Sequence, residues 1–163
     1  MSRTALLIVD MQKGAREWTS LKPLFDKALW NINEISQMFR KENLPVIVIQ
    51  HCEVGGQKNE HYNNVDELIV SEKDYRIEKN YFNAFWKTDL DEILKKEDVD
   101  CVIVGGFAAE FCVTATCNGA LERGYNVLLM QNGIAGLSEE GVKVLHNLRP
   151  LISLEALKYF VKG

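Results

Sequence analysis

The sequence predicts an α/β fold, a three-layer doubly wound sandwich whose mostly parallel sheet has about six strands. Short apolar segments rich in valine and isoleucine recur along the chain, as they do in strands buried on both faces of a parallel sheet. Segments with helical periodicity separate them, and right-handed crossovers through such helices keep successive strands parallel. The 163 residues contain no repeat and no linker rich in proline or glycine. We therefore expect a single domain over 1–163.

Four apolar segments carry the strand prediction, namely ALLIVDM (5–11), PVIVIQH (45–51), CVIVGGF (101–107) and NVLLMQN (126–132). A weaker and shorter strand is expected at YRIEK (75–79), and a last strand near LISLEAL (151–157). The glycine pair at the end of 101–107 marks a tight turn into the helix that follows.

Helices are predicted between these strands. The longest covers 24–43, where apolar residues recur on one side, and Asn43 together with Pro45 ends it. Shorter helices are expected within 88–97 and 138–148, and Ser138 is a suitable N-cap for the second of them.

Composition excludes several classes of protein. A net charge of -4 and a pI of about 5.4, without a basic stripe, argue against nucleic-acid binding and favour a small-molecule partner. No apolar stretch is long enough for a membrane span or a signal peptide, so we expect a cytoplasmic protein without a membrane partner. The cysteines form no CxxC pair, which argues against a disulfide framework; they are Cys52, Cys101, Cys112 and Cys117.

Reactive side chains follow three of the predicted strands. Asp10 closes the first, Lys79 ends the short strand, and Cys112 lies beyond the glycine turn at the start of a helix. The carboxyl ends of parallel strands share one edge of the sheet, where ligands bind in doubly wound folds. A helix start favours a thiolate, a carboxylate can accept the thiol proton, and an ammonium can stabilise the products. Each residue alone also has an ordinary explanation, as a turn residue, a solvated lysine or a buried thiol. Their joint placement favours a catalytic site.

With these three blocks in order, the chain resembles the isochorismatase-like cysteine hydrolases, which include nicotinamidases and N-carbamoylsarcosine amidases. The resemblance covers essentially the whole chain and rests on Asp10-Met11-Gln12, on Lys79 with Tyr81 and FWKTDL (85–90), and on GGFAAEFCVTAT (105–116). It implies that Asp10, Lys79 and Cys112 form a catalytic triad.

The resemblance also implies an oxyanion hole. A cis peptide bond between Phe107 and Ala108 would direct the Ala108 N–H toward the site, together with the N–H of Cys112. The implied activity is cysteine-dependent hydrolysis of a small-molecule amide, carbamoyl or related C–N bond through a thioester. Hydrolysis of isochorismate itself is disfavoured, because protonation of a vinyl ether needs no thiol. A homo-oligomer, a dimer or tetramer, is implied as well.

We expect no cofactor and no metal. Nicotinamidases of this family hold a metal with an Asp-x-His pair and a later histidine, whereas this chain has Gln50-His51-Cys52-Glu53 and then His61. Zinc bound by His51, Glu53 and His61 is the alternative, but the spacing does not match, and polar loop residues are the simpler interpretation.

Substrate contacts are expected from residues near the three blocks, namely Gln12, Trp18, His51, Tyr81, Phe82 and Phe107. The aromatic residues among them are as typical of a core as of a pocket wall. Two other function classes remain as alternatives: a redox-sensing thiol protein, and a catalytically idle oligomeric binding subunit. An activated Cys112 would be alkylated well below the ordinary thiol pKa.

Overall fold

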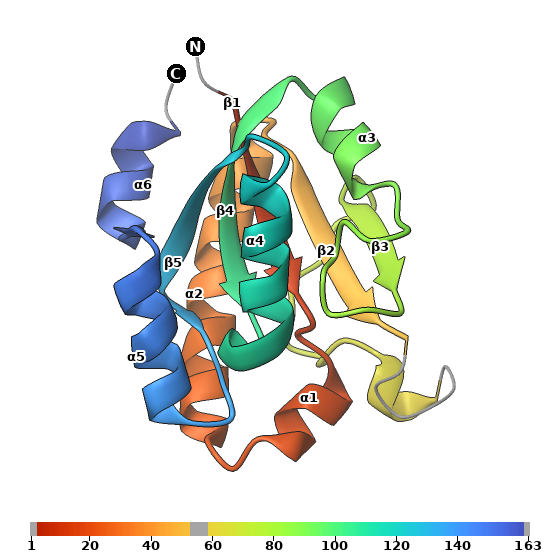
Figure 1. Cartoon of the computed structure of the whole chain (residues 1–163), viewed down its shortest axis with the longest axis vertical. Helices are drawn as coiled ribbons and strands as arrows, with labels where there is room; N and C mark the ends of the chain where they lie inside the picture. The colour runs from red at the N-terminus through yellow and green to blue at the C-terminus, as the bar shows by residue number, and fades with distance from the viewer. Residues whose placement is uncertain (1–2, 53–58, 162–163) are drawn as a thin grey trace.

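The computed structural model describes residues 3–52 and 59–161, in which helices cover both faces of a six-stranded sheet (Figure 1). The strands are β1 (Arg3–Val9), β2 (Val46–His51), β3 (Tyr75–Lys79), β4 (Val99–Gly106), β5 (Asn126–Ile134) and β6 (Leu151–Ile152). Their order is β3-β2-β1-β4-β5-β6, and every neighbouring pair is parallel. The predicted doubly wound fold is confirmed.

The helices divide between the two faces of the sheet. They are α1 (Lys13–Trp18), α2 (Lys22–Lys41), α3 (Leu90–Lys96), α4 (Thr114–Leu121), α5 (Glu139–Leu148) and α6 (Leu154–Phe160), with a 3-10 turn η1 (Glu60–Tyr62) and a π-helical turn η2 (Ala109–Val113). Side chains of α2 and α6 belong to one core, and those of α3, α4 and α5 to the other. In Figure 1, α4 lies in front of the sheet and α2 behind it.

Strand β1 shows why the apolar segments are unbroken. Ala5, Leu7 and Val9 pack into one core, while Leu6 and Ile8 pack into the other, and all five side chains are fully buried. A strand covered on both faces has no solvent side, so it does not alternate between polar and apolar residues. Burying each large aliphatic side chain contributes about 1.5–3 kcal/mol.

The chain after the sixth strand differs from the prediction. Only Leu151–Ile152 pairs with β5, and α6 begins at Leu154, so the expectation of a strand near 151–157 is wrong for most of that segment. The hydroxyl of Ser153 accepts a hydrogen bond from the Ala156 N–H at 3.1 Å and caps the new helix. A serine cap therefore decides the local structure against the apolar pattern.

The centre of the sheet is where strand order reverses, between β1 and β4. A crevice opens at the carboxyl ends of the strands at such a point. Gly106 ends β4 with a φ of 132°, and a Cβ there would lie 2.0 Å from the Val9 carbonyl oxygen. Glycine thus allows the two strand ends to lie against each other, and the Phe107 N–H donates to the Val9 carbonyl at 2.9 Å.

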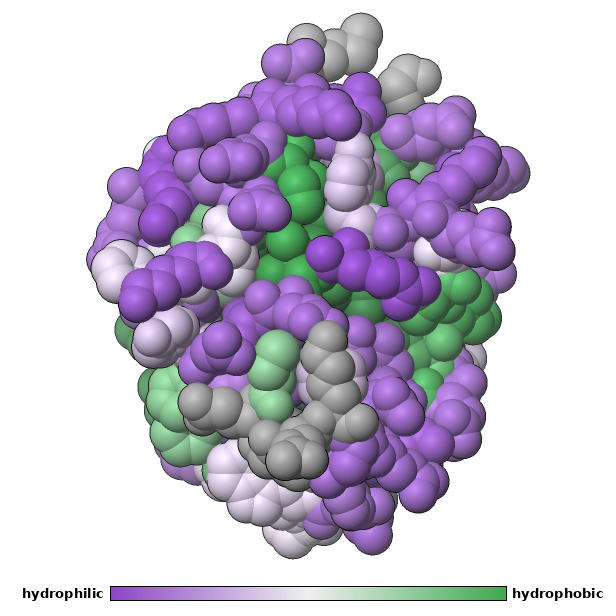
Figure 2. Space-filling model, turned by 90° about the vertical axis from the view of Figure 1, so that its right-hand side faces the viewer, coloured by the Kyte–Doolittle hydropathy of each residue, from purple (hydrophilic) through white to green (hydrophobic). Residues whose placement is uncertain are grey.

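Strand β3 forms one edge of the sheet, and β6 forms the other. Arg76 and Glu78 are exposed while Ile77 and Lys79 are buried, which is the pattern of a strand with one solvated side. The side of the molecule turned toward the viewer in Figure 2 is mostly hydrophilic, with apolar surface showing between polar side chains. Within the described parts of the chain, no helix has the length and apolar character needed to cross a membrane.

Candidate active site

Three buried side chains meet at the carboxyl end of the sheet. Asp10 directly follows β1, with a φ of 50°, and its N–H donates to the Ile49 carbonyl at 3.0 Å. Lys79 is the last residue of β3, and Cys112 lies in η2 just beyond β4. Their exposed fractions are 2%, 1% and 7%, respectively. The strands thus bring together residues that are up to 102 positions apart in the sequence.

Lys79 connects the other two residues. Its ammonium donates to the Asp10 Oδ2 at 2.8 Å and to the Cys112 Sγ at 3.2 Å. A buried ammonium needs a counter-charge, because desolvation of an isolated ion costs several kcal/mol. Asp10 supplies that charge. The second carboxylate oxygen, Oδ1, is buried and accepts no hydrogen bond from any residue that the structure describes.

The surroundings of Cys112 favour its neutral thiol. Burial and the charge of Asp10 raise the pKa of this thiol and Lys79 lowers it, and together they take the pKa from the ordinary 9.0 to about 12. The expectation that the helix start would favour a thiolate is therefore wrong for the resting protein. Desolvation by burial is the largest cause of this rise.

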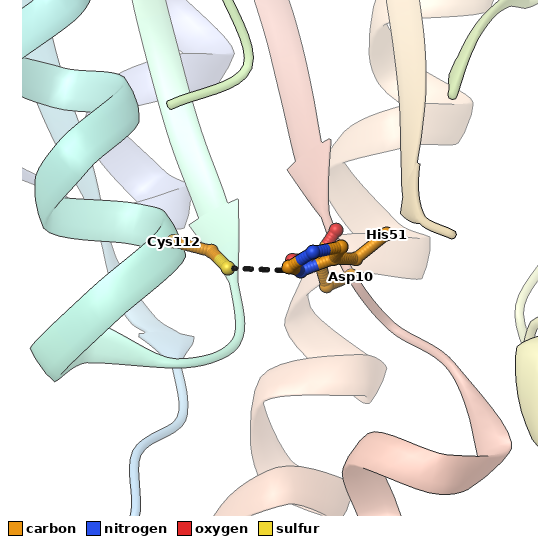
Figure 3. A group of neighbouring side chains, drawn as sticks. All are labelled: Asp10, His51 and Cys112. Atoms are coloured by element: carbon orange, nitrogen blue, oxygen red, sulfur yellow. Dashed lines mark hydrogen bonds between the residues drawn. The ribbon is translucent and has the colours of Figure 1, made fainter. Parts of the chain in front are cut away.

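His51 completes the group from the end of β2. Its Nδ1 lies 3.8 Å from the Cys112 Sγ, and Asp10, His51 and Cys112 present atoms that all lie within 4.8 Å of one another. In Figure 3 the imidazole and the Asp10 carboxylate lie side by side and face the thiol. The sequence placed His51 among the substrate contacts and, as an alternative, among zinc ligands, but not among the catalytic residues. The signal that it ends a buried strand, as Asp10 and Lys79 do, was available.

Asp10, His51 and Cys112 are poorly placed to bind a metal ion. Carboxylate, imidazole and thiolate are zinc ligands, but Lys79 already binds Asp10 and Cys112, and its charge opposes a cation in the same place. The alternative zinc ligands were His51, Glu53 and His61, but the imidazole of His61 pairs with the Glu17 carboxylate at 2.8 Å. Glu53 lies outside the described residues. No metal step is therefore derived for this site.

Gln12 is buried behind the site. Its amide nitrogen donates to the carbonyls of His51 at 3.2 Å and Tyr62 at 2.7 Å, and its amide oxygen accepts from the His51 N–H at 2.9 Å. These bonds tie the end of β1 to the end of β2 and to η1. Gln12, predicted as a substrate contact, is not among the described residues that line the cavity.

A cavity of about 570 Å³ opens in front of the thiol. Four of the predicted substrate contacts line it, namely Trp18, His51, Phe82 and Phe107, whereas Tyr81 does not appear among the described lining residues. Phe111, Glu17 and His61 also line it and were not predicted as substrate contacts. Four of the lining residues are tryptophan or phenylalanine. Trp18 packs edge-on against Phe107, and the Phe82 ring is tilted against that of Phe111, with 5.4 Å between their centroids.

The turn before Cys112 has an unusual backbone. The Phe107–Ala108 peptide bond is cis, and the Ala108 carbonyl accepts from the N–H groups of Phe111 and Val113. The second of these bonds spans five residues and makes η2 a π-helical turn, a feature frequent at functional sites. Within residues 3–52 and 59–161, no acceptor is bonded to the Ala108 N–H. Ala108 is one of the residues that line the cavity.

Glu110 anchors the same turn. Its carboxylate accepts from the Leu137 N–H at 3.1 Å, the Ser138 N–H at 2.9 Å and the Ser138 hydroxyl at 3.0 Å. The loop before α5 is thereby attached to the residue two positions before the thiol. Ser138 also caps α5 through the Gly141 N–H at 2.9 Å, as predicted.

The fold and the site together define an α/β protein with a buried acid, lysine and thiol at the point where strand order reverses. Residues 4–152 match the isochorismatase domain, and the chain belongs to that family of hydrolases. Nicotinamidase 3 of Arabidopsis thaliana is 30% identical over 154 residues, which cover 83% of this chain and 75% of that protein.

Solved structures show the same fold. The N-carbamoylsarcosine amidase of Thermoplasma acidophilum superposes with a TM-score of 0.79 and 23% identity, covering 93% of this chain and 95% of the other. The pyrazinamidase of Pyrococcus horikoshii, solved in complex with zinc, superposes with a TM-score of 0.81 and 24% identity. The match covers 93% of this chain and 99% of the other. At these identities, the two likenesses concern the fold alone.

Proposed function

We propose that the protein hydrolyses a C–N bond of a small-molecule amide or carbamoyl compound, with Cys112 as the nucleophile. One observation carries the proposal: the Lys79 ammonium contacts both the Asp10 carboxylate at 2.8 Å and the Cys112 sulfur at 3.2 Å, next to a cavity of about 570 Å³. An inert buried thiol does not need an acid and a cation placed beside it.

The reaction follows from this arrangement. Asp10 takes the thiol proton through its unoccupied Oδ1, while Lys79 stabilises the thiolate as it forms. The thiolate attacks the carbonyl carbon, and the N–H groups of Ala108 and Cys112 bind the developing oxyanion. Asp10 returns the proton to the leaving nitrogen as the C–N bond breaks. Water then cleaves the thioester.

The names of similar proteins support this class of substrate. The relative that is 30% identical is a nicotinamidase, and the two similar structures are an N-carbamoylsarcosine amidase and a pyrazinamidase. Each of these names denotes cleavage of a C–N bond beside a carbonyl group. The aromatic walls of the cavity favour a flat or apolar substrate body.

The state of Cys112 counts against a redox sensor. Sensor thiols have low pKa values and are accessible to solvent, whereas burial raises the pKa of Cys112 to about 12. An idle binding subunit would not need the contacts of Lys79 with both Asp10 and Cys112.

We further propose that the protein forms a homo-oligomer. Trp18, Phe82 and Phe111 line the cavity, yet between 38% and 65% of each residue is exposed. A second copy covering this aromatic rim would bury apolar surface and exclude water from the thiol.

A substrate screen tests the proposal. The wild-type protein is incubated with small amides, carbamoyl amines and ureido acids, and ammonia release is measured. We expect turnover of at least one class, with none above background for Cys112→Ala. Cys117→Ala is the matched control, because Cys117 is also buried but does not appear among the described lining residues. Turnover by Cys112→Ala equal to that of the wild type would refute covalent catalysis.

A further inference from the structure

We propose that His51 is the general base of the second half-reaction, in which water cleaves the thioester on Cys112. This inference rests on the proposed function and adds a catalytic residue to it. Asp10 serves the formation of the thioester, and His51 serves its hydrolysis. The two half-reactions then have separate proton acceptors on either side of the sulfur.

The position of His51 suits this role. It is the last residue of β2, its side chain lines the cavity, and only 6% of the residue is exposed. The 3.8 Å between its Nδ1 and the Cys112 Sγ places the imidazole beside the carbonyl of any acyl group on that sulfur. A water between imidazole and carbonyl would be within reach of both, as general base catalysis requires.

Gln12 fixes the backbone of His51, and an aromatic ring lies against the imidazole. Gln12 binds both backbone groups of His51, at 2.9 Å and 3.2 Å. The centroids of the Phe82 ring and the imidazole are 6.1 Å apart, in an edge-to-face arrangement. A base that is already oriented adds little entropic cost to the reaction. Gln12 is therefore a positioning residue that acts through His51.

Asp10 is less suited to activating water. Its Oδ2 is bonded to Lys79 at 2.8 Å, and the proposed first half-reaction already uses its other oxygen, Oδ1, for the thiol proton. A neutral imidazole beside the sulfur can accept a proton from water directly. The chain places such a group at the thiol, and the first half-reaction leaves it unused.

The proton balance of the step is complete. Neutral His51 takes a proton from water through Nδ1 while the water oxygen forms a bond to the thioester carbonyl carbon. The tetrahedral intermediate collapses, the C–S bond breaks, and sulfur leaves with the electron pair. The proton on the imidazolium passes to the thiolate, which restores the thiol and neutral His51. The acyl group leaves as the carboxylic acid.

An activated ester separates the two half-reactions. With 4-nitrophenyl acetate, acylation of Cys112 releases 4-nitrophenolate without any need to protonate the leaving group. Loss of the acetyl group from Cys112 is then followed by intact-protein mass. For His51→Gln we expect a burst of nitrophenolate like that of the wild type, followed by deacylation at least about 100-fold slower, because general base catalysis contributes about 10²–10⁴. His146→Gln is the matched control, because this histidine of α5 is not among the described residues that line the cavity.

Hydroxylamine distinguishes a base from a structural residue. This strong nucleophile attacks thioesters without a general base, so it should restore rapid deacylation in His51→Gln. Deacylation by water at the wild-type rate in His51→Gln would overturn the inference while leaving the proposed function intact. Equal slowing of both steps without rescue would also overturn it, since that indicates a structural role. If Cys112 of the wild type is not acylated at all, the proposed function fails and this inference with it.

Discussion

Replacing Asp10 by asparagine should make Cys112 more reactive toward alkylating agents and at the same time abolish hydrolysis. The charge of Asp10 raises the pKa of the thiol, whereas Lys79 lowers it. In the variant, the buried ammonium of Lys79 keeps its contact with the sulfur but loses its carboxylate partner. Ionisation of the thiol then supplies the missing counter-charge.

The size of the effect follows from the geometry. The facing atoms of Asp10 and Cys112 lie within 4.8 Å. At about this distance two unit charges interact by roughly 3.5 kcal/mol for an effective dielectric constant near 20. The amide dipole and relaxation offset part of this, so we expect the pKa of Cys112 to fall by about two units.

Alkylation reports this change directly. Two units give about 100-fold more thiolate at neutral pH, and each thiolate is about eightfold less nucleophilic because nucleophilicity falls with basicity. The net expectation is roughly tenfold faster modification. The assay is iodoacetamide labelling at pH 7.5, followed at the Cys112 peptide by mass spectrometry so that Cys52, which is half-buried, does not interfere.

Lys79→Met is the control, because it should change the labelling rate in the opposite direction. Loss of the ammonium should raise the pKa of Cys112 and slow its labelling. Both variants are first checked for native circular dichroism and a cooperative thermal transition. Labelling of a folded Asp10→Asn protein at or below the wild-type rate would refute the electrostatic reasoning. Retained amide hydrolysis by that variant would refute the role of Asp10 as the base.

Two further predictions concern pH and metals. Burial raises the pKa of Cys117 from 9.0 to about 12, so its contribution to stability is complete below pH 9 and is lost as pH rises toward 12. Urea unfolding at pH 8 and 10.5 should show this as a decline of up to about 1.4 kcal/mol per pH unit for this group, and an unchanged slope in Cys117→Ala would contradict it. Dialysis against a chelator should leave the hydrolysis rate unchanged, and a stoichiometric, tightly bound metal found by elemental analysis would show that the charge argument from Lys79 fails.

Much of the fold was predictable because each local signal agreed with the tertiary environment. The apolar segments around β1, β2, β4 and β5 are buried on both sides, so hydrophobicity alone marked them as strands. The end of the chain shows the limit of this reasoning. Residues 151–157 have an apolar pattern that suits a strand, yet Ser153 caps a helix there. A two-residue strand at the sheet edge gives too few ladder bonds to compete.

The candidate site was also only partly predictable from the sequence. The sequence was enough to place Asp10, Lys79 and Cys112 at one edge, because parallel strands present their carboxyl ends together. It did not show that Glu110 anchors the turn before the thiol, because its partners, Leu137 and Ser138, are far along the chain.

By itself, the sequence determined the sheet, the chain order of acid, lysine and thiol, and the edge where they meet, because these follow from local hydrophobicity and strand direction. Only the tertiary structure decided that burial and the charge of Asp10 raise the pKa of Cys112 and that His51 faces the sulfur. Both depend on what packs around each group. Desolvation and charge act through space, over a few ångströms, between residues that the sequence keeps far apart.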